Sequence, residues 1–97
     1  MKIDKLILIS ELRRHYKLSE TFFEEVEYFE LMQIQNISNQ KYILKKELRQ
    51  LEKIIRLHDD LEINMQGIDV IMHLTDRINV LKQELQEMKR QLALHEN

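Results

Sequence analysis

The chain has 97 residues and a net charge of -2; hydrophobic residues make up 43% of it and charged residues 33%. This composition is typical of a folded domain with one small core and argues against a disordered tail. With no proline and a single glycine, few tight turns can form, so long helices are expected rather than a β-rich fold. The absence of cysteine excludes disulfides, thiolate metal ligands and a thiol nucleophile.

The longest purely apolar run, residues 6–9, is far shorter than the roughly 20 residues of a membrane-spanning helix. No basic and then apolar signal segment with a small-residue cleavage site follows Met1. We therefore expect a cytoplasmic protein without a membrane segment.

A short strand is predicted at the start of the chain, because Ile7 and Ile9 are β-branched and lie in the apolar run. This strand should end at Ser10, which is a suitable N-cap for a helix over residues 11–16.

Ser19 can cap a second helix that runs to about Glu30. The helical period places three apolar residues on one face, expected in the core: Phe22, Val26 and Phe29. The opposite face carries Glu20, Glu24, Glu27 and Tyr28, with Leu31 near its end. Residues 19–32 contain no lysine or arginine, so this face should be strongly acidic and should meet solvent or a partner.

Residues 34–43 alternate between apolar and polar on both sides of Ser38-Asn39-Gln40, which predicts a hairpin whose turn type the sequence leaves open. A third helix is expected from about Leu44 to Leu61. Its buried stripe should consist of Leu44, Leu48, Leu51, Ile54 or Ile55, and Leu57 or Leu61.

The last helix begins near Asn64, a suitable N-cap, and Gly67 in its first turn should allow close packing on the third helix. The chain thus divides into a body, residues 1–63, and a long C-terminal helix, residues 64–97. This helix carries a heptad repeat of seven apolar residues: Ile71, Leu74, Ile78, Leu81, Leu85, Met88 and Leu92.

The heptad repeat predicts a coiled coil and therefore a homodimer through the C-terminal helix. Both strand orientations stay open, because in a parallel pair Glu84 would attract Lys89 of the other chain while Arg77 would repel Lys82. In the alternative interpretation, the apolar residues pack on the chain's own body or on another protein.

The order of the predicted elements resembles the MerR-type winged helix-turn-helix over almost the whole chain. This order is a strand, a helix, a turn, a second helix, a two-stranded wing and two further helices. We therefore expect a mostly α, MerR-like winged helix-turn-helix with a small β-hairpin wing and a long C-terminal coiled-coil helix. Four stretches are similar to the chaperone-modulator branch of that group, the CbpM family: Ile9-Ser10-Glu11-Leu12, Leu18-Ser19-Glu20, the segment from Ile55 to Asn64 with its Arg56-Leu57-His58, and Gly67-Ile68.

The resemblance implies a regulator that binds and inhibits the J-domain of a DnaJ-type co-chaperone such as CbpA. J-domains of this type expose a basic helix, and residues 19–30 stand where a DNA-binding relative has its recognition helix. The expected partner-binding residues are therefore Glu20, Glu24, Glu27 and Tyr28, with the exposed aromatic ring as an interface anchor among charges.

Binding to DNA, as a MerR-like transcriptional regulator, is the alternative function. DNA binding depends on cations that neutralise phosphates, whereas the outward glutamates would repel them. The predicted wing offers only Lys41, and the basic residues Arg13, Arg14, His15 and Lys17 either touch phosphate or form a solvated face. The glutamates could also provide solubility alone.

No catalytic, metal or cofactor site is expected. The histidines His15, His58, His73 and His95 lie in separate segments without a His-Glu-x-x-His pair, and no Gly-rich phosphate loop is present. Asp69 and His73 are spaced for a contact along one helix, an arrangement more typical of a surface pair than of a metal site.

Overall fold

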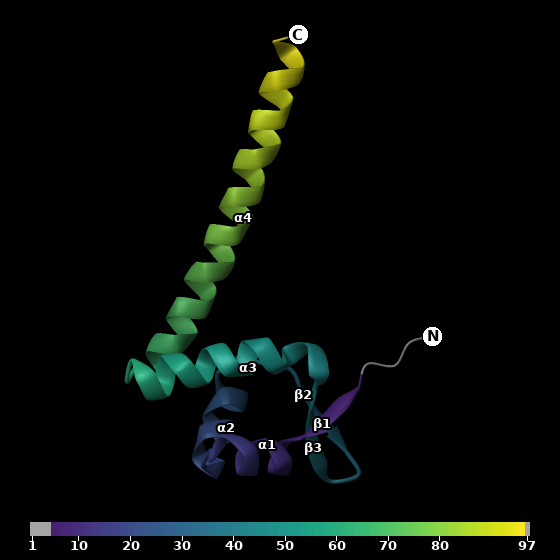
Figure 1. Cartoon of the computed structure of the whole chain (residues 1–97), viewed down its shortest axis with the longest axis vertical. Helices are drawn as coiled ribbons and strands as arrows, with labels where there is room; N and C mark the ends of the chain where they lie inside the picture. Colours follow the sequence, from purple (N-terminus) through teal and green to yellow (C-terminus); the bar gives the residue numbers. More distant parts are fainter. Residues whose placement is uncertain (1–4, 97) are drawn as a thin grey trace.

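The computed structural model describes residues 5–96 and consists of a winged body from which one long helix projects (Figure 1). The elements are β1 (Leu6–Leu8), α1 (Ile9–Tyr16), α2 (Glu20–Tyr28), β2 (Ile34–Ile37), β3 (Gln40–Leu44), a 3₁₀ turn (Lys45–Glu47), α3 (Leu48–Ile55), a π-helical turn (Arg56–Asp60) and α4 (Met65–His95). The predicted fold class is confirmed. Residues 1–4 of the predicted body and Asn97 of the predicted helical segment lie outside the described residues.

The three strands form one antiparallel sheet in the order β1-β3-β2. Ile43 lies in the middle of the sheet, opposite Ile7 on one side and Ile34 on the other, and is fully buried. The predicted hairpin is present. Its turn residues Ser38 and Asn39 have φ values of 52° and 66°, as a type I′ turn requires.

The predicted N-cap at Ser10 is wrong, because α1 already begins at Ile9 and Leu8 occupies the cap position without a side-chain hydrogen bond. Ile9 and Leu12, three residues apart on the helix, are both buried in the core. Burying an isoleucine side chain contributes about 1.5 to 3 kcal/mol, whereas a serine cap contributes about 1 kcal/mol. Packing of Ile9 therefore decides where the helix starts.

At the start of α2 the predicted cap is confirmed, since the Phe22 backbone N–H donates to Oγ of Ser19 at 3.0 Å. The helix ends at Tyr28, before the predicted end, because Glu30 adopts a left-handed φ of 53° and the Leu31 N–H bonds back to the Val26 carbonyl at 3.0 Å. This reversal carries Leu31 into the core, so its predicted place beside the outward face is wrong.

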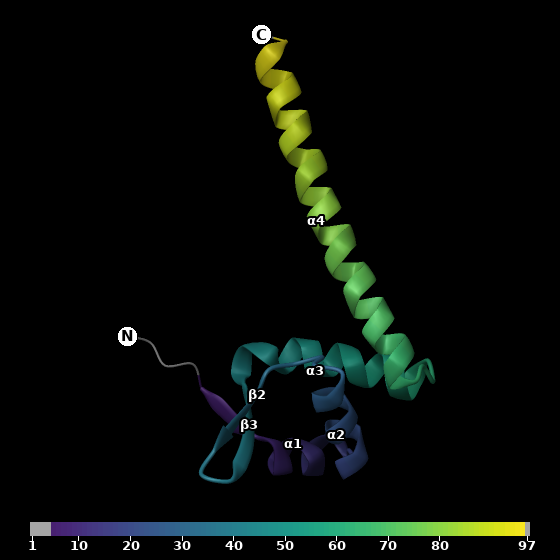
Figure 2. The same ribbon diagram turned by 180° about the vertical axis from the view of Figure 1, so that it is seen from behind.

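The core fills the space between the sheet, α1, α2, α3 and the base of α4, with α3 lying across the other body helices (Figures 1 and 2). Phe22 and Val26 are buried as expected, and Phe29 is only partly buried. Leu51 and Ile54 of α3 are fully buried. The remaining core residues include Leu18, Phe23, Met32, Met65, Ile68 and Met72.

The third predicted helix is wrong at its start, because Leu44 still pairs with Leu6 in the sheet and a 3₁₀ turn precedes α3. Its buried stripe continues to Leu57, while Leu61 is exposed.

Asn64 caps α4 as predicted, its Oδ1 accepting from the Gly67 N–H at 2.8 Å. A Cβ at Gly67 would lie 2.8 Å from Cγ2 of Ile63. The glycine therefore makes room for the chain segment just before α4, and the predicted packing on α3 is not the reason for it.

Candidate functional site

The outward face of α2 presents Glu20, Glu24 and Glu27, all of them exposed. Residues 19–32 contain no lysine or arginine, but the fold brings Lys41 from β3, with Nζ 2.7 Å from Oε2 of Glu27. Both side chains of this ion pair are about half exposed. Glu20 and Glu24 have no ion pair within residues 5–96, so most of the negative charge on this face is not compensated by a direct contact.

A groove of about 200 Å³, here called the α2 groove, runs between α2 and the wing. Its charged lining consists of the three glutamates together with Arg13 and Lys41. Its floor is apolar and consists of Ile9, Phe23 and Ile34. Because both signs of charge flank an apolar floor, the groove suits a polypeptide that presents an apolar side chain next to cations.

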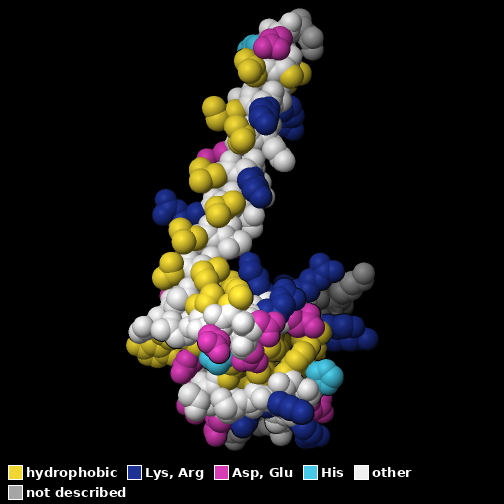
Figure 3. All heavy atoms as spheres, turned by 60° about the vertical axis from the view of Figure 1, so that its left-hand side comes forward, with side chains coloured by type: hydrophobic (Ala, Val, Ile, Leu, Met, Phe, Trp, Pro, Cys, Tyr) yellow, Lys and Arg dark blue, Asp and Glu magenta, His cyan; other side chains and the backbone are white. Residues whose placement is uncertain are grey.

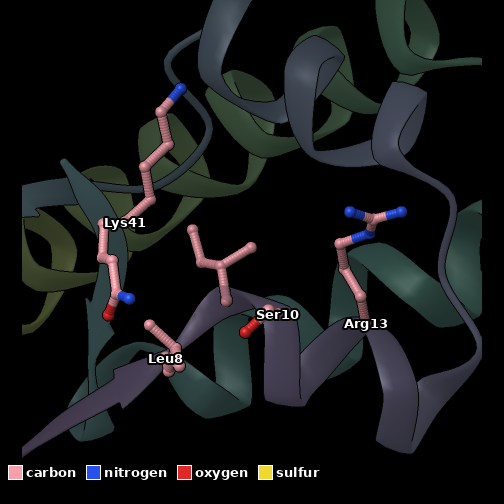
Figure 4. A pocket seen from close by; sticks show the side chains of 6 residues that line it. Leu8, Ser10, Arg13 and Lys41 are labelled. Atoms are coloured by element: carbon pink, nitrogen blue, oxygen red, sulfur yellow. The ribbon is translucent and has the colours of Figure 1, made fainter.

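A second hollow, of about 280 Å³, lies beside the α2 groove and is lined by Leu8, Ile9, Ser10, Arg13, Gln40 and Lys41. Figure 4 shows Arg13 and Lys41 on opposite sides of this hollow. Arg13 is held by a bond from Nε to the Leu18 carbonyl at 3.4 Å. These two cations line both hollows and form the positive border of the acidic face.

Tyr28 is 80% exposed, and its ring contacts Phe29 edge to face at a centroid distance of 5.0 Å. It lines a different hollow, of about 360 Å³, at the junction of α2 with α4. Tyr28 thus flanks the acidic face instead of lying among Glu20, Glu24 and Glu27. The surface at α2 consequently has two parts, a charged groove and an exposed aromatic ring beside the base of α4.

The predicted dimerisation residues lie along α4, and all but Ile71, which is partly buried, are between 50% and 65% exposed. Figure 3 shows a row of hydrophobic side chains that follows the helix away from the body. We call the seven predicted dimerisation residues the α4 stripe. In the described part of the chain, no helix has the length and apolar character required to cross a bilayer.

The histidines take part in local contacts. Nδ1 of His73 lies 2.8 Å from the Asp69 carbonyl and 3.2 Å from Oδ1 of Asp69, so this pair is a contact along one helix. The backbone hydrogen bond and the nearby carboxylate raise the pKa of His73 above its usual 6.5. His58 packs its ring on Phe22 and contacts the Asp59 carboxylate. Among residues 5–96, no three histidine or carboxylate side chains gather to form a metal site.

Comparison with known proteins identifies the family of the chain. No curated protein and no solved structure matches the chain. One family model, described as MerR HTH family regulatory protein, matches residues 7–90. This span runs from β1 through the rest of the body and includes most of α4. The chain therefore belongs to the MerR helix-turn-helix family of regulatory proteins.

Proposed function

We propose that this protein is a chaperone modulator of the CbpM type, which binds the J-domain of a DnaJ/CbpA-type co-chaperone through α2 and inhibits it. The observation that carries the proposal is the outward face of α2. At the position of a recognition helix it exposes Glu20, Glu24 and Glu27, and α2 itself contains no lysine or arginine. A basic helix, as J-domains of this type expose, is the complementary surface. In this role the protein acts in the cytoplasm and has no catalytic activity.

In the proposed complex, cations of the J-domain face Glu20 and Glu24, and an apolar side chain lies on the floor of the α2 groove. A cation that reaches Glu27 must displace Lys41 from its ion pair. Tyr28 adds an exposed ring at the edge of the same surface. Occupied in this way, the basic helix of the J-domain cannot approach its Hsp70 partner, which is the proposed basis of inhibition.

A MerR-like DNA-binding regulator is the second candidate, favoured by family membership and by Arg13 and Lys41 beside the α2 groove. Against it, a duplex docked on α2 would bring phosphates close to three carboxylates. Salt screens charges over about 8 Å at physiological ionic strength, and groove contacts lie well inside that distance.

The test is a charge reversal on α2, Glu24→Lys with Glu27→Lys, measured by calorimetry with a purified J-domain. We expect loss of binding, and loss of inhibition of J-domain-stimulated ATP hydrolysis by Hsp70, with the helical circular dichroism unchanged. The matched control is Asp60→Lys with Glu62→Lys, which changes the net charge equally at two exposed positions beyond α3.

Undiminished binding by the α2 variant would refute the proposed site. Binding of random duplex DNA by the unaltered protein in a low-salt gel shift, without binding of the J-domain, would support the second candidate instead.

A further inference from the structure

The hollow beside the α2 groove is built from β1, α1 and β3 and is called here the wing hollow. Its lining consists of Leu8, Ile9, Ser10, Arg13, Gln40 and Lys41 (Figure 4). Leu8 and Ile9 are aliphatic, and both charged members of the lining are cations. Among residues 5–96 no carboxylate lines it, whereas three glutamates line the α2 groove. The two hollows therefore favour ligands of opposite charge.

Arg13 is held in a position that suits anion binding. Its Nε donates to the Leu18 carbonyl at 3.4 Å, which fixes the guanidinium against the chain just after α1. Its two Nη atoms have no hydrogen-bond partner among the described residues. A guanidinium can donate two parallel hydrogen bonds to a carboxylate, and its planar fork is already arranged for them. Arg13 therefore offers a free double donor to an anion in the wing hollow.

Lys41 lines both hollows, and its one ammonium group cannot serve both at once. In the structure Nζ lies 2.7 Å from Oε2 of Glu27, at the α2 groove. The two side chains are 48% and 47% exposed, and ion pairs as exposed as this contribute little stability. An anion bound beside Arg13 can therefore attract Lys41 away from Glu27 at small cost.

The size and lining of the wing hollow indicate a class of ligand. Its volume of about 280 Å³ is at the small end for small-molecule sites, so a short chain fits better than a large ring system. The described lining has aliphatic side chains and no aromatic ring. One negative charge is favoured over the two of phosphate, because desolvating a second charge against an apolar lining is costly.

We propose that the wing hollow binds a small aliphatic carboxylate. Its carboxylate group contacts Arg13 and Lys41, and its chain lies on Leu8 and Ile9. Binding takes Lys41 from Glu27, so that the glutamates of α2 are left without an ion pair and can receive a cationic partner. The ligand is thus a positive regulator of the α2 surface. This regulatory part rests on the proposed function, whereas binding of the carboxylate does not depend on it.

Thermodynamic linkage makes the effect reciprocal. A cationic partner at Glu27 and a carboxylate at Lys41 break the same ion pair, so each ligand favours binding of the other. The carboxylate must raise the affinity for the partner by the same factor by which the partner raises the affinity for the carboxylate. Because the ion pair is weak, we expect a factor of about two to five.

Octanoate is the probe for direct binding, and it is titrated into the whole chain without any partner. NMR spectra should show saturable shifts at the methyl groups of Leu8 and Ile9 and at the Nε–H of Arg13, with a dissociation constant in the millimolar range. Octanol has the chain without the charge, and acetate and inorganic phosphate have charge without the chain. Each of these three should bind at least about tenfold more weakly.

Substitutions of the two cations should weaken octanoate binding unequally. Arg13→Gln should weaken it about tenfold, and Lys41→Gln about threefold, because Lys41 must first leave Glu27. Arg13→Lys keeps the charge but loses the fork, so its affinity should lie between those of the native chain and Arg13→Gln. Arg14→Gln removes an exposed neighbouring cation that does not line the hollow, and this matched control should bind octanoate unchanged.

Three results would overturn the carboxylate site. The first is binding of octanol or phosphate as tight as that of octanoate. The second is undiminished octanoate binding by both Arg13→Gln and Lys41→Gln. The third is the absence of saturable shifts at the wing hollow, including the case in which octanoate shifts only the exposed apolar residues of the α4 stripe.

The regulatory part is tested by calorimetry with a purified J-domain at saturating octanoate. Binding should tighten about two- to fivefold for the native chain and stay unchanged for Lys41→Gln, which has no cation to withdraw. An equal gain in Lys41→Gln, or no gain in the native chain, would refute the regulation. A J-domain that binds neither with nor without octanoate would refute the proposed function and its regulation together, a result distinct from failure of octanoate to bind the chain alone.

Discussion

The winged body and the outer part of α4 use the same apolar residue types in opposite ways. In the body, Leu51, Ile54 and Ile43 are fully buried, whereas Leu74 and the later stripe residues of α4 are at least half exposed. The body and the base of α4 therefore obtain their hydrophobic stabilisation within one chain, whereas the outer part of α4 can obtain it only from another molecule. The outward side of the body is charged at α2, so the two regions should recognise their partners by different forces.

Removing a core side chain should have the largest effect. Leu51→Ala leaves a cavity in the middle of the body and should lower the free energy of unfolding by about 2 to 5 kcal/mol. Urea denaturation followed by circular dichroism measures this change. A loss below about 1 kcal/mol would mean that the body does not depend on this core.

The matching change on α4 should break association and spare the body. Leu81→Lys places a charge in the centre of the stripe and should raise the dissociation constant of the predicted homodimer by about 100-fold or more. Sedimentation velocity measures association, and amide chemical shifts of the body report its fold. Gln83→Lys, on the outer side of the same helical turn, is the control and should remain dimeric.

A smaller effect is expected at the wing. Ser38 and Asn39 both hold a left-handed backbone, which Asn followed by Gly adopts more readily. Ser38→Asn with Asn39→Gly should stabilise the body by about 1 kcal/mol and should not change self-association. A lowered melting temperature would contradict the type I′ turn.

A single substitution of Lys41 should change the affinity of the acidic face of α2 for a J-domain. Lys41→Gln removes the cation that occupies Glu27, and should tighten J-domain binding by about two- to fivefold. Lys45→Gln, an equal charge change in the 3₁₀ turn, is the control. Weaker binding after Lys41→Gln would refute the competition, and on a DNA-binding surface the same change would weaken duplex binding.

The smallest effect concerns His73, where α4 leaves the body. Its backbone contact to Asp69 and the nearby carboxylate raise its pKa, which a proton NMR titration measures directly. Asp69→Asn should lower this pKa but leave it above the usual value, because the backbone hydrogen bond remains. Because the pKa of His73 is higher in the folded state than in the unfolded state, protonated His73 stabilises the fold below about pH 6.5. This stabilisation is lost as the pH rises through the raised pKa. An unchanged pKa in Asp69→Asn would exclude the carboxylate as a cause.

Local patterns predicted much of the fold. Helical periodicity identified α2 and α4, alternation identified the hairpin, and the caps Ser19 and Asn64 are where their side chains predict them. The errors are at element ends, where tertiary packing decides. Ile9 joins α1 because its side chain is buried, and Glu30 takes a left-handed conformation that sequence patterns assign to glycine.

For the candidate site, periodicity alone correctly placed Glu20, Glu24 and Glu27 on an exposed face. It could not show that Lys41 reaches Glu27 from β3, because that contact depends on how the wing folds back on α2. The helical period also grouped Tyr28 with the glutamates, although the base of α4 gives it different neighbours. In both cases the missing information was the position of an element distant in sequence.

The length of α4 determines how far apart the two acidic faces of a homodimer would lie. Its 31 residues extend about 46 Å at the rise of an α-helix. A homodimer with antiparallel α4 helices, one of the two orientations that the heptad repeat allows, would hold its acidic faces near opposite ends of this rod, too far apart for one small domain to touch both. Each assembly would then offer two equivalent docking points, so a target that itself carries paired J-domains at a compatible separation would be retained far more tightly than a single J-domain.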